Sequence, residues 1–242
     1  MWNVDLTLVD VTKVSREAYA EAFRRVTGYP LVALPQTAGR TDSEIFFEAL
    51  ALNEDAADPN LGQAEAGGQD LLARYTSELA AAFARRSDLL GVQGRALPGA
   101  GEAVAAVASL RDVIQSVLTG TIRPNAVAKL RAFGIDRFLD LEVGGYGSEV
   151  YPMGAQLLRS RGRAWEKYGS DIGPDATVYI GDSVRDVEAA RIGGARSMAV
   201  ASGRSTAAEL RDAGADLVLD DLTDTRAVVA AVGRLTAAVS AG

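Results

Sequence analysis

Residues 177–192 read Thr-Val-Tyr-Ile-Gly-Asp-Ser-Val-Arg-Asp-Val-Glu-Ala-Ala-Arg-Ile, and this stretch decides the fold that we expect. The apolar run over 177–180 predicts a buried strand, and the spacing over 184–192 predicts a helix. Asp182 follows the strand, and Asp186 falls in the first turn of the helix. Both carboxylates can therefore face one cation, and Mg²⁺ is the ion that such an oxygen-only site holds. Alternatively, Asp186 only stabilises the helix dipole.

Strands and helices continue to alternate from residue 98 to the end of the chain. The predicted strands lie at residues 113–118, 139–143, 197–201 and 217–219, and a first strand is predicted over residues 2–9. The predicted helices lie at residues 102–110 and 156–168 and begin at Pro124, Ser205 and Asp224. Such alternation is typical of an α/β, Rossmann-like core, in which helices cover both faces of a parallel sheet.

The segment between the first strand and residue 98 has a different pattern. Apolar residues at helical spacing predict three helices: one with Ser15 as its N-cap, one after Thr41, and a long one that ends near Phe83. Residues 53–68 are rich in Ala, Asp and Gly and are predicted to form a loop. We therefore expect an α/β core domain made of residues 1–11 and 90–242, with an inserted helical domain over residues 12–89.

The composition restricts the chemistry. The 242 residues include 25 basic and 32 acidic side chains, which gives a net charge of −7, and they include neither histidine nor cysteine. Serine–histidine triads, catalytic thiols, disulfides and zinc sites built on Cys or His are therefore excluded. Any metal must be a hard cation held by oxygen, and acid–base catalysis must use carboxylates, Lys or Tyr.

The charge and the apolar runs also indicate partners and location. An acidic chain is a poor match for nucleic acid, whose phosphates bind basic surfaces. The apolar run over residues 227–238 is interrupted by Arg234 and is too short to cross a membrane. Asn3 and Asp5 stand where a signal peptide has basic and then apolar residues. We expect a cytoplasmic protein with no nucleic-acid or membrane partner.

Three polar segments form the tips of predicted strands: Asn3 with Asp5, Thr119 with Gly120, and the Asp182 segment described above. The carboxyl ends of parallel strands meet at one edge of a sheet, and ligands bind there. Each segment alone has a plainer explanation as a strand-to-helix turn or a helix cap. Together, in this order, they predict one functional site.

These segments resemble the motifs of the haloacid dehalogenase-like (HAD) superfamily, in particular its phosphoglycolate phosphatase-like members with a helical cap. The first motif of that family, hhhhDxDGTLhD, corresponds to Met1-Trp-Asn-Val-Asp-Leu-Thr-Leu-Val-Asp10. The second, an apolar strand ending in Thr or Ser, corresponds to Val117-Leu-Thr-Gly120, and the fourth, hhhGDxxxD, to Tyr179-Ile-Gly-Asp-Ser-Val-Arg-Asp186. The resemblance covers nearly the whole chain and gives residues 12–89 the place of the cap.

The resemblance implies a Mg²⁺-dependent phosphatase mechanism. In the family, the first Asp of the first motif attacks the substrate phosphorus, and the second Asp serves as acid and then as base. Carried over by position, Asp5 is the acid/base, and Thr119 and Gly120 contact the phosphate. The implied metal ligands are Asn3, Asp5 through its carbonyl, Asp182 and Asp186. In the cap, Arg40 pairs with an anionic substrate group or is simply exposed.

Two positions depart from the family pattern. The nucleophile position holds Asn3, whose carboxamide can offer an oxygen to Mg²⁺ but is a poor nucleophile. The basic residue expected upstream of the Gly-Asp pair is missing, because position 157 is Leu. The nearest bases fall within the predicted helix over 156–168; one of them reaches the phosphate, or all form a solvated helix face. These bases are Arg159, Arg161 and Arg163.

The sequence leaves three functions open. The first is a HAD-type phosphatase scaffold for a small phosphorylated metabolite, disabled or strongly impaired by Asn3. The second is a HAD fold repurposed as a binding or regulatory protein. The third is a non-hydrolytic enzyme that uses Asp5 as acid/base without covalent catalysis.

Overall fold

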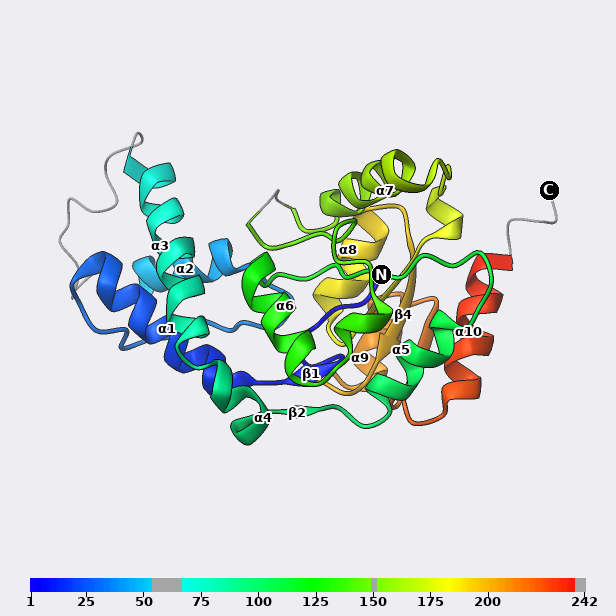
Figure 1. Cartoon of the computed structure of the whole chain (residues 1–242), viewed down its shortest axis with the longest axis horizontal. Coiled ribbons are helices and arrows are strands. Elements are labelled where there is room, and N and C mark those ends of the chain that lie inside the picture. Colours follow the sequence, from blue (N-terminus) through cyan, green and yellow to red (C-terminus); the bar gives the residue numbers. More distant parts are fainter. Residues whose placement is uncertain (54–66, 149–151, 238–242) are drawn as a thin grey trace.

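The computed structural model describes residues 1–53, 67–148 and 152–237 (Figure 1). Its helices are α1 (Thr12–Thr27), α2 (Asp42–Leu52), α3 (Gly67–Ala84), α4 (Leu90–Gln93), α5 (Ala100–Ala108), α6 (Arg123–Ala132), α7 (Ala155–Tyr168), α8 (Val184–Ile192), α9 (Ala207–Asp212) and α10 (Thr225–Ala237). Its strands are β1 (Val9–Asp10), β2 (Arg95–Ala96), β3 (Val178–Gly181), β4 (Arg196–Val200) and β5 (Leu217–Leu219).

A parallel sheet forms the centre of the fold. β3, β4 and β5 pair in this order, with Val178 opposite Arg196 and Met198 opposite Leu217. All four residues of β3 are buried, which explains why its sequence is an unbroken apolar run. Helices α8 and α9 make the crossovers between these strands, as parallel pairing requires. The α/β fold predicted from the alternating pattern is confirmed.

Isolated parallel bridges extend this arrangement beyond β3. Trp2 bridges Ile180 on one side and Val117 on the other, and Leu118 bridges Gly145. The segments that end at Asn3, at Thr119 and at β3 therefore run side by side in the same direction. Their carboxyl ends meet at one edge of the molecule, which is the location of the site described below.

Three predicted strands are wrong in extent. The pairing of residues 113–118 is limited to the bridges at Val117 and Leu118, and residues 139–143 turn before the bridge at Gly145. Residues 2–9 make single bridges until β1, which pairs antiparallel with β2 instead of joining the parallel sheet. Most predicted helices agree with the structure within a few residues. Ser15 is not an N-cap, because α1 already begins at Thr12.

Helices cover both faces of the sheet. The larger hydrophobic cluster joins the strand residues Trp2, Ile180 and Met198 to α5 and α10. A second cluster places Leu157 of α7 and Ala190 of α8 against the other face. Figure 1 shows this layered arrangement, with α7 at the top of the view, α8 below it, and α5 and α10 toward the right.

Helices α1, α2 and α3 supply most of another hydrophobic cluster, which also includes Val11, Leu90 and Ile122. Phe46 of α2 stacks on Tyr75 of α3 with ring centroids 4.0 Å apart, and Phe23 of α1 meets Phe46 edge-on. α2 begins with a capping box, in which Thr41 and Glu44 bond each other's main-chain N–H groups. The loop predicted over 53–68 lies almost entirely outside the described residues.

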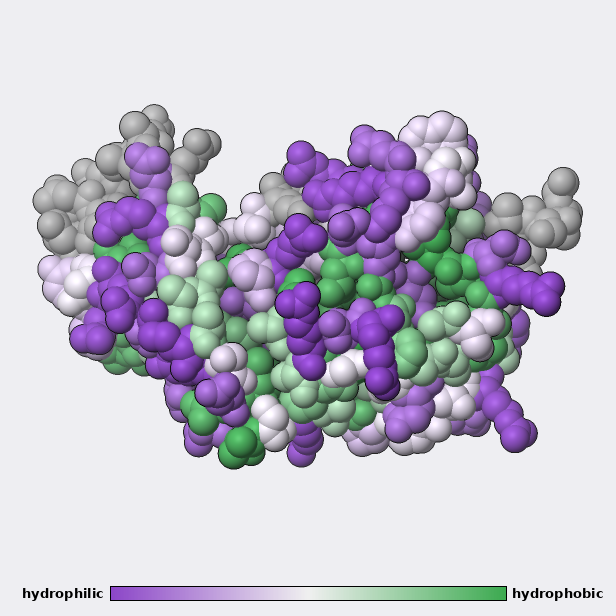
Figure 2. Space-filling model, viewed as in Figure 1, coloured by the Kyte–Doolittle hydropathy of each residue, from purple (hydrophilic) through white to green (hydrophobic). Residues whose placement is uncertain are grey.

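The face of the molecule in Figure 2 carries polar residues over the outer turns of α1 and α7. Within the described residues, no helix combines the length and the apolar character that crossing a bilayer requires.

An ion-pair network ties α1 to α3. Glu21 accepts hydrogen bonds from Arg86 at 2.6 Å, from Arg85 at 2.7 Å and from Arg25 at 2.9 Å. These arginines, Arg86 above all, lower the pKa of Glu21 to about 2. A carboxyl group whose pKa is depressed on folding stabilises the fold above its unfolded pKa, and this stabilisation is lost as the pH falls toward its folded pKa.

We expect Glu21→Gln to lower the free energy of unfolding at pH 7 by about 1 kcal/mol, a value reduced for solvent screening. The difference from the unchanged protein should shrink as the pH falls from about 4.5 toward 2, because Glu21 then becomes protonated in both states. Urea unfolding at a series of pH values measures this. A difference that is independent of pH would contradict the assignment.

Candidate active site

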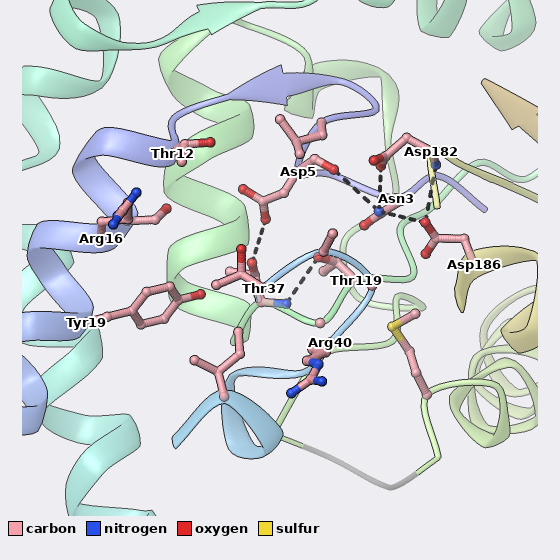
Figure 3. Close-up of a pocket in the computed structure, with 18 residues that line it drawn as sticks. Asn3, Asp5, Thr12, Arg16, Tyr19, Thr37, Arg40, Thr119, Asp182 and Asp186 are labelled. Carbon is pink, nitrogen blue, oxygen red and sulfur yellow. Dashed lines mark hydrogen bonds between the residues drawn. The ribbon is translucent and has the colours of Figure 1, made fainter. Parts of the chain in front are cut away.

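A pocket at the carboxyl ends of the parallel segments is lined by seven of the residues singled out from the sequence (Figure 3). These are Asn3, Asp5, Arg40, Thr119, Gly120, Asp182 and Asp186. The pocket is small and partly open to solvent. Residues of α1 form the opposite wall.

Two buried carboxylates form the floor of the pocket. Asp186 stands at the third position of α8, where its carboxylate bonds the N–H and hydroxyl of Ser183 as part of a capping box. It also accepts a hydrogen bond from the hydroxyl of Tyr179 at 2.7 Å. Asp182 accepts from Thr7 at 2.8 Å. Burial raises the pKa of both carboxyl groups, and the charge of Asp186 raises the pKa of Asp182 further.

The amide group of Asn3 fills the space between these carboxylates and the main chain. Its nitrogen lies 3.2 Å from Oδ1 of Asp182, 3.4 Å from Oδ2 of Asp186 and 3.4 Å from the carbonyl oxygen of Asp5. Its oxygen accepts a hydrogen bond from the N–H of Val4 at 2.8 Å. Three oxygen atoms therefore converge on one point, and the amide nitrogen occupies it.

This set of oxygen atoms matches what a hard divalent cation needs. Asp182, Asp186 and the carbonyl of Asp5 supply only oxygen, and a half-turn of the Asn3 amide would add Oδ1. Asp5 does not extend the acidic cluster, because its carboxylate is engaged elsewhere. Accordingly, the described residues contain no group of three Asp, Glu, His or Cys side chains that could hold a metal. These residues fit Mg²⁺ only if the Asn3 amide turns, so that Oδ1 and not the nitrogen faces the two carboxylates.

A buried lysine holds the carboxylate of Asp5. Nζ of Lys129 lies 2.8 Å from both carboxylate oxygens of Asp5 and 3.0 Å from the hydroxyl of Thr121. Thr121 in turn donates to Asp5 at 2.7 Å. Lys129 comes from α6, is only 2% exposed and faces the ring of Phe83 in α3. It makes Asp5 part of a fixed ion pair at the edge of the pocket.

Sequence reasoning missed Lys129. The signal was weak but present, because Lys129 stands beside Leu130 and three residues after Ala126, on the apolar side of its helix. A lysine within such a face is usually a solvated residue at its border. Only the fold brings it to Asp5, which lies far away in the chain.

The loop that follows Val117-Leu118 is in direct contact with the helical segment. A Cβ at Gly120 would lie 1.9 Å from the main-chain oxygen of Arg40, so only glycine fits here. The N–H of Asp42 donates to the carbonyl of Gly120 at 2.7 Å. The buried carboxylate of Asp42 accepts from Tyr19 at 2.6 Å and from the N–H of Ile122 at 2.7 Å. Residues 38–42 thus close the pocket over Thr119.

The arginines that were candidates for binding an anionic substrate group bond other parts of the protein. Arg40 lines the pocket, but its guanidinium is paired with Glu48. Arg161 donates to the carbonyl of Gly193, and Arg163 to that of Gly144. None of the three arginines of α7 lines this pocket, so the expectation that one of them reaches it is not supported.

Known proteins resemble the chain in sequence pattern and in fold. The pattern of the haloacid dehalogenase-like hydrolases matches residues 1–191, and that of a HAD-hydrolase-like family matches residues 159–225. No curated protein matches the sequence.

Several solved structures share the fold over most of their length. A hydrolase from Pseudomonas syringae is 21% identical, with 93% of this chain and 94% of that chain covered and a TM-score of 0.60. A predicted phosphoglycolate phosphatase from Haemophilus somnus is 18% identical, with 94% and 95% covered and a TM-score of 0.59. A putative beta-phosphoglucomutase from Bacteroides vulgatus is 17% identical, with 97% and 88% covered and a TM-score of 0.64.

At such identities the solved structures support the fold alone, whereas the family pattern spans well over half of the chain and both the first and the last polar segment of the pocket. The chain therefore belongs to the haloacid dehalogenase-like hydrolase family.

Proposed function

We propose that this protein is a phosphatase scaffold that binds a small phosphorylated metabolite together with Mg²⁺, and that Asn3 strongly impairs its covalent step. The observation that supports this is the convergence of Asn3, Thr119 and the Asp182–Asp186 pair in one pocket, with Asp5 at its edge. A cytoplasmic location and the absence of nucleic-acid and membrane partners stay predictions.

The magnesium ion would be held by Asp182, by Asp186, by the carbonyl of Asp5 and by Oδ1 of a turned Asn3. When bound, Mg²⁺ offsets the negative charge of the phosphoryl group and of the buried carboxylates. Without a cation this floor is a poor place for a phosphate, because two buried carboxyl groups already stand there.

The remaining residues of the pocket bind and orient the substrate. The hydroxyl of Thr119 and the N–H of Gly120 are the donors that would hold phosphoryl oxygens. Asp5, held by Lys129 and Thr121, would exchange a proton with the leaving group and with water. Helices α1–α3 would act as a cap, because residues 38–42 already lie on the loop at Gly120.

Asn3 is the residue of this site that is least suited to the covalent step. An uncharged amide is a poor nucleophile, and its nitrogen carries no lone pair suited to attack on phosphorus. An aspartate there would supply the attacking oxygen, with the same number of heavy atoms.

We expect Asn3→Asp to raise the rate of phosphate release from small phosphomonoesters by about a thousandfold or more, because it restores a nucleophilic carboxylate. Phosphate release with millimolar Mg²⁺, measured for both proteins side by side on a substrate panel, tests this. The control is the double variant Asn3→Asp, Asp182→Asn, which should be silent.

Two results would contradict the proposal. One is robust, metal-dependent turnover by the Asn3 protein itself. The other is silence from a folded Asn3→Asp variant across the panel.

Magnesium should stabilise the Asn3→Asp variant more than the unchanged protein. In the variant a third carboxylate faces Asp182 and Asp186, so we expect a lower Tm without metal and a larger rise of Tm on adding Mg²⁺. Thermal unfolding with and without Mg²⁺ measures both. Equal shifts in the two proteins would argue against this cation site.

Lys129 should affect the rate of catalysis by holding the carboxylate of Asp5 in place. In the Asn3→Asp background, we expect Lys129→Met to lower kcat by about 10- to 100-fold with little change in KM, because Asp5 loses its anchor. The matched control is Lys167→Met, which removes a lysine paired with Asp140 and Glu142 outside the pocket. Thr121→Val, which removes the other donor to Asp5, should lower kcat in the same way. A loss confined to Tm or to KM would assign Lys129 a structural role only.

A binding or regulatory protein is the second candidate function. The observation that favours it is the complete hydrogen bonding of the Asn3 amide, which satisfies the pocket floor without a metal. This candidate predicts that the Asn3 protein binds phosphorylated ligands, while the folded Asn3→Asp variant binds them without turnover.

A further inference from the structure

Tyr179 is a buried polar residue that contacts the floor of the pocket and has no part in the phosphoryl chemistry described above. It stands in β3, is only 1% exposed and does not line the pocket. Its hydroxyl donates to Oδ1 of Asp186 at 2.7 Å and lies 3.1 Å from the carbonyl oxygen of Leu118, the residue before Thr119. One side chain thus connects β3, the start of α8 and the loop that carries Thr119.

The hydrogen bond of Tyr179 leaves one oxygen of Asp186 for a cation. Oδ1 is held by the tyrosine, whereas Oδ2 lies 3.4 Å from the amide nitrogen of Asn3, at the point where three oxygen atoms converge. Oδ2 also accepts a hydrogen bond from the N–H of Ser183 at 2.9 Å. Because each oxygen has its own donor, the carboxylate is held against rotation and directs Oδ2 alone to that point.

Asp182 is restricted in the same way by a different contact. Its Oδ1 lies 3.2 Å from the amide nitrogen of Asn3. Its Oδ2 packs against Gly203, where an added Cβ would lie only 1.9 Å from this oxygen. Figure 3 shows the amide nitrogen of Asn3 facing both carboxylates. Each aspartate therefore offers a single oxygen to the point that the nitrogen occupies.

The number of oxygen atoms that each carboxylate offers distinguishes two common divalent cations. Mg²⁺ requires a small, nearly ideal octahedron and keeps several water molecules, so one or two carboxylates are enough to bind it. Ca²⁺ is larger, accepts about six to eight oxygen atoms and can take both oxygens of one carboxylate. A site in which the second oxygen of each aspartate is engaged elsewhere suits the smaller ion.

We propose that Tyr179 is a positioning residue that makes Asp186 a one-oxygen ligand, so that the cation site prefers Mg²⁺ to Ca²⁺. The tyrosine does not touch the cation. It acts through the carboxylate, as hydrogen-bonded neighbours of metal ligands do in many proteins. Without its hydroxyl, Oδ1 of Asp186 loses its donor and can turn toward the cation beside Oδ2. This inference rests on the proposed function, which supplies the cation.

Isothermal titration with MgCl₂ and with CaCl₂, at constant ionic strength, tests the inference without turnover. The titrations use the unchanged protein and its Asn3→Asp variant. On introducing Tyr179→Phe into either, we expect the affinity for Mg²⁺ to fall by about tenfold or more and the affinity for Ca²⁺ by about threefold or less. The ratio of the two affinities reports the positioning role, because a general loosening of the fold would weaken the binding of both ions alike.

Tyr146→Phe is the matched control. Tyr146 is as buried as Tyr179, and its hydroxyl donates to the carbonyl oxygen of Leu141. Neither Tyr146 nor Leu141 lines the pocket. This variant loses a comparable buried hydrogen bond, and we expect it to keep the affinities for both ions within about twofold.

Two results would overturn the inference and leave the proposed function intact. One is a ratio of Mg²⁺ to Ca²⁺ affinity that Tyr179→Phe does not change. The other is tighter binding of Ca²⁺ than of Mg²⁺ by the protein with Tyr179 in place, a measurement that needs no tyrosine variant to fold. If neither the unchanged protein nor its Asn3→Asp variant binds Mg²⁺, the cation site itself is wrong, and both proposals are overturned.

Discussion

Two adjacent buried carboxylates, Asp182 and Asp186, are the constraint on which the pocket depends. The parallel alignment of the chain places them at the end of β3 and the start of α8, where burial disfavours their charges. Something must stabilise such a pair: a proton, a hydrogen-bond donor or a cation. In this chain Asn3 donates to both, so the residue at the proposed nucleophile position also stabilises the floor of the pocket.

The closure of the pocket depends on the neighbouring loop. Gly120 lets residues 38–42 come into main-chain contact, and Asp42 holds them there through Tyr19 and Ile122. These contacts bring residues of α1, residues 37–40 and the loop at Gly120 together as the lining of one pocket. Separating these segments requires breaking the hydrogen bonds of Asp42 with Tyr19, Ile122 and Gly120.

Much of the fold was predictable because β3 and α8 carry strong local signals, a buried apolar run and a capping box. The true extent of the strands predicted over 113–118 and 139–143 was not predictable. Their pairing is limited to single bridges, which no local sequence pattern encodes. The pocket residues were predictable from their positions after strands. Lys129 was not, because its partner Asp5 is joined to it only by tertiary packing. The sequence also left open whether an arginine of α7 reaches the phosphate, and none of the three lines this pocket.

In the function proposed above, residue 3 occupies the nucleophile position of a phosphoryl-transfer site. Intact-protein mass spectrometry after mixing with a reactive phosphomonoester and Mg²⁺ tests it most directly, using an Asn3→Asp, Asp5→Asn variant in which hydrolysis of the intermediate is slowed. We predict a phosphoryl adduct that peptide mapping places on residue 3, and no adduct on the unchanged protein. An adduct on the unchanged protein, or none on the folded variant with a ligand that binds, would contradict the account.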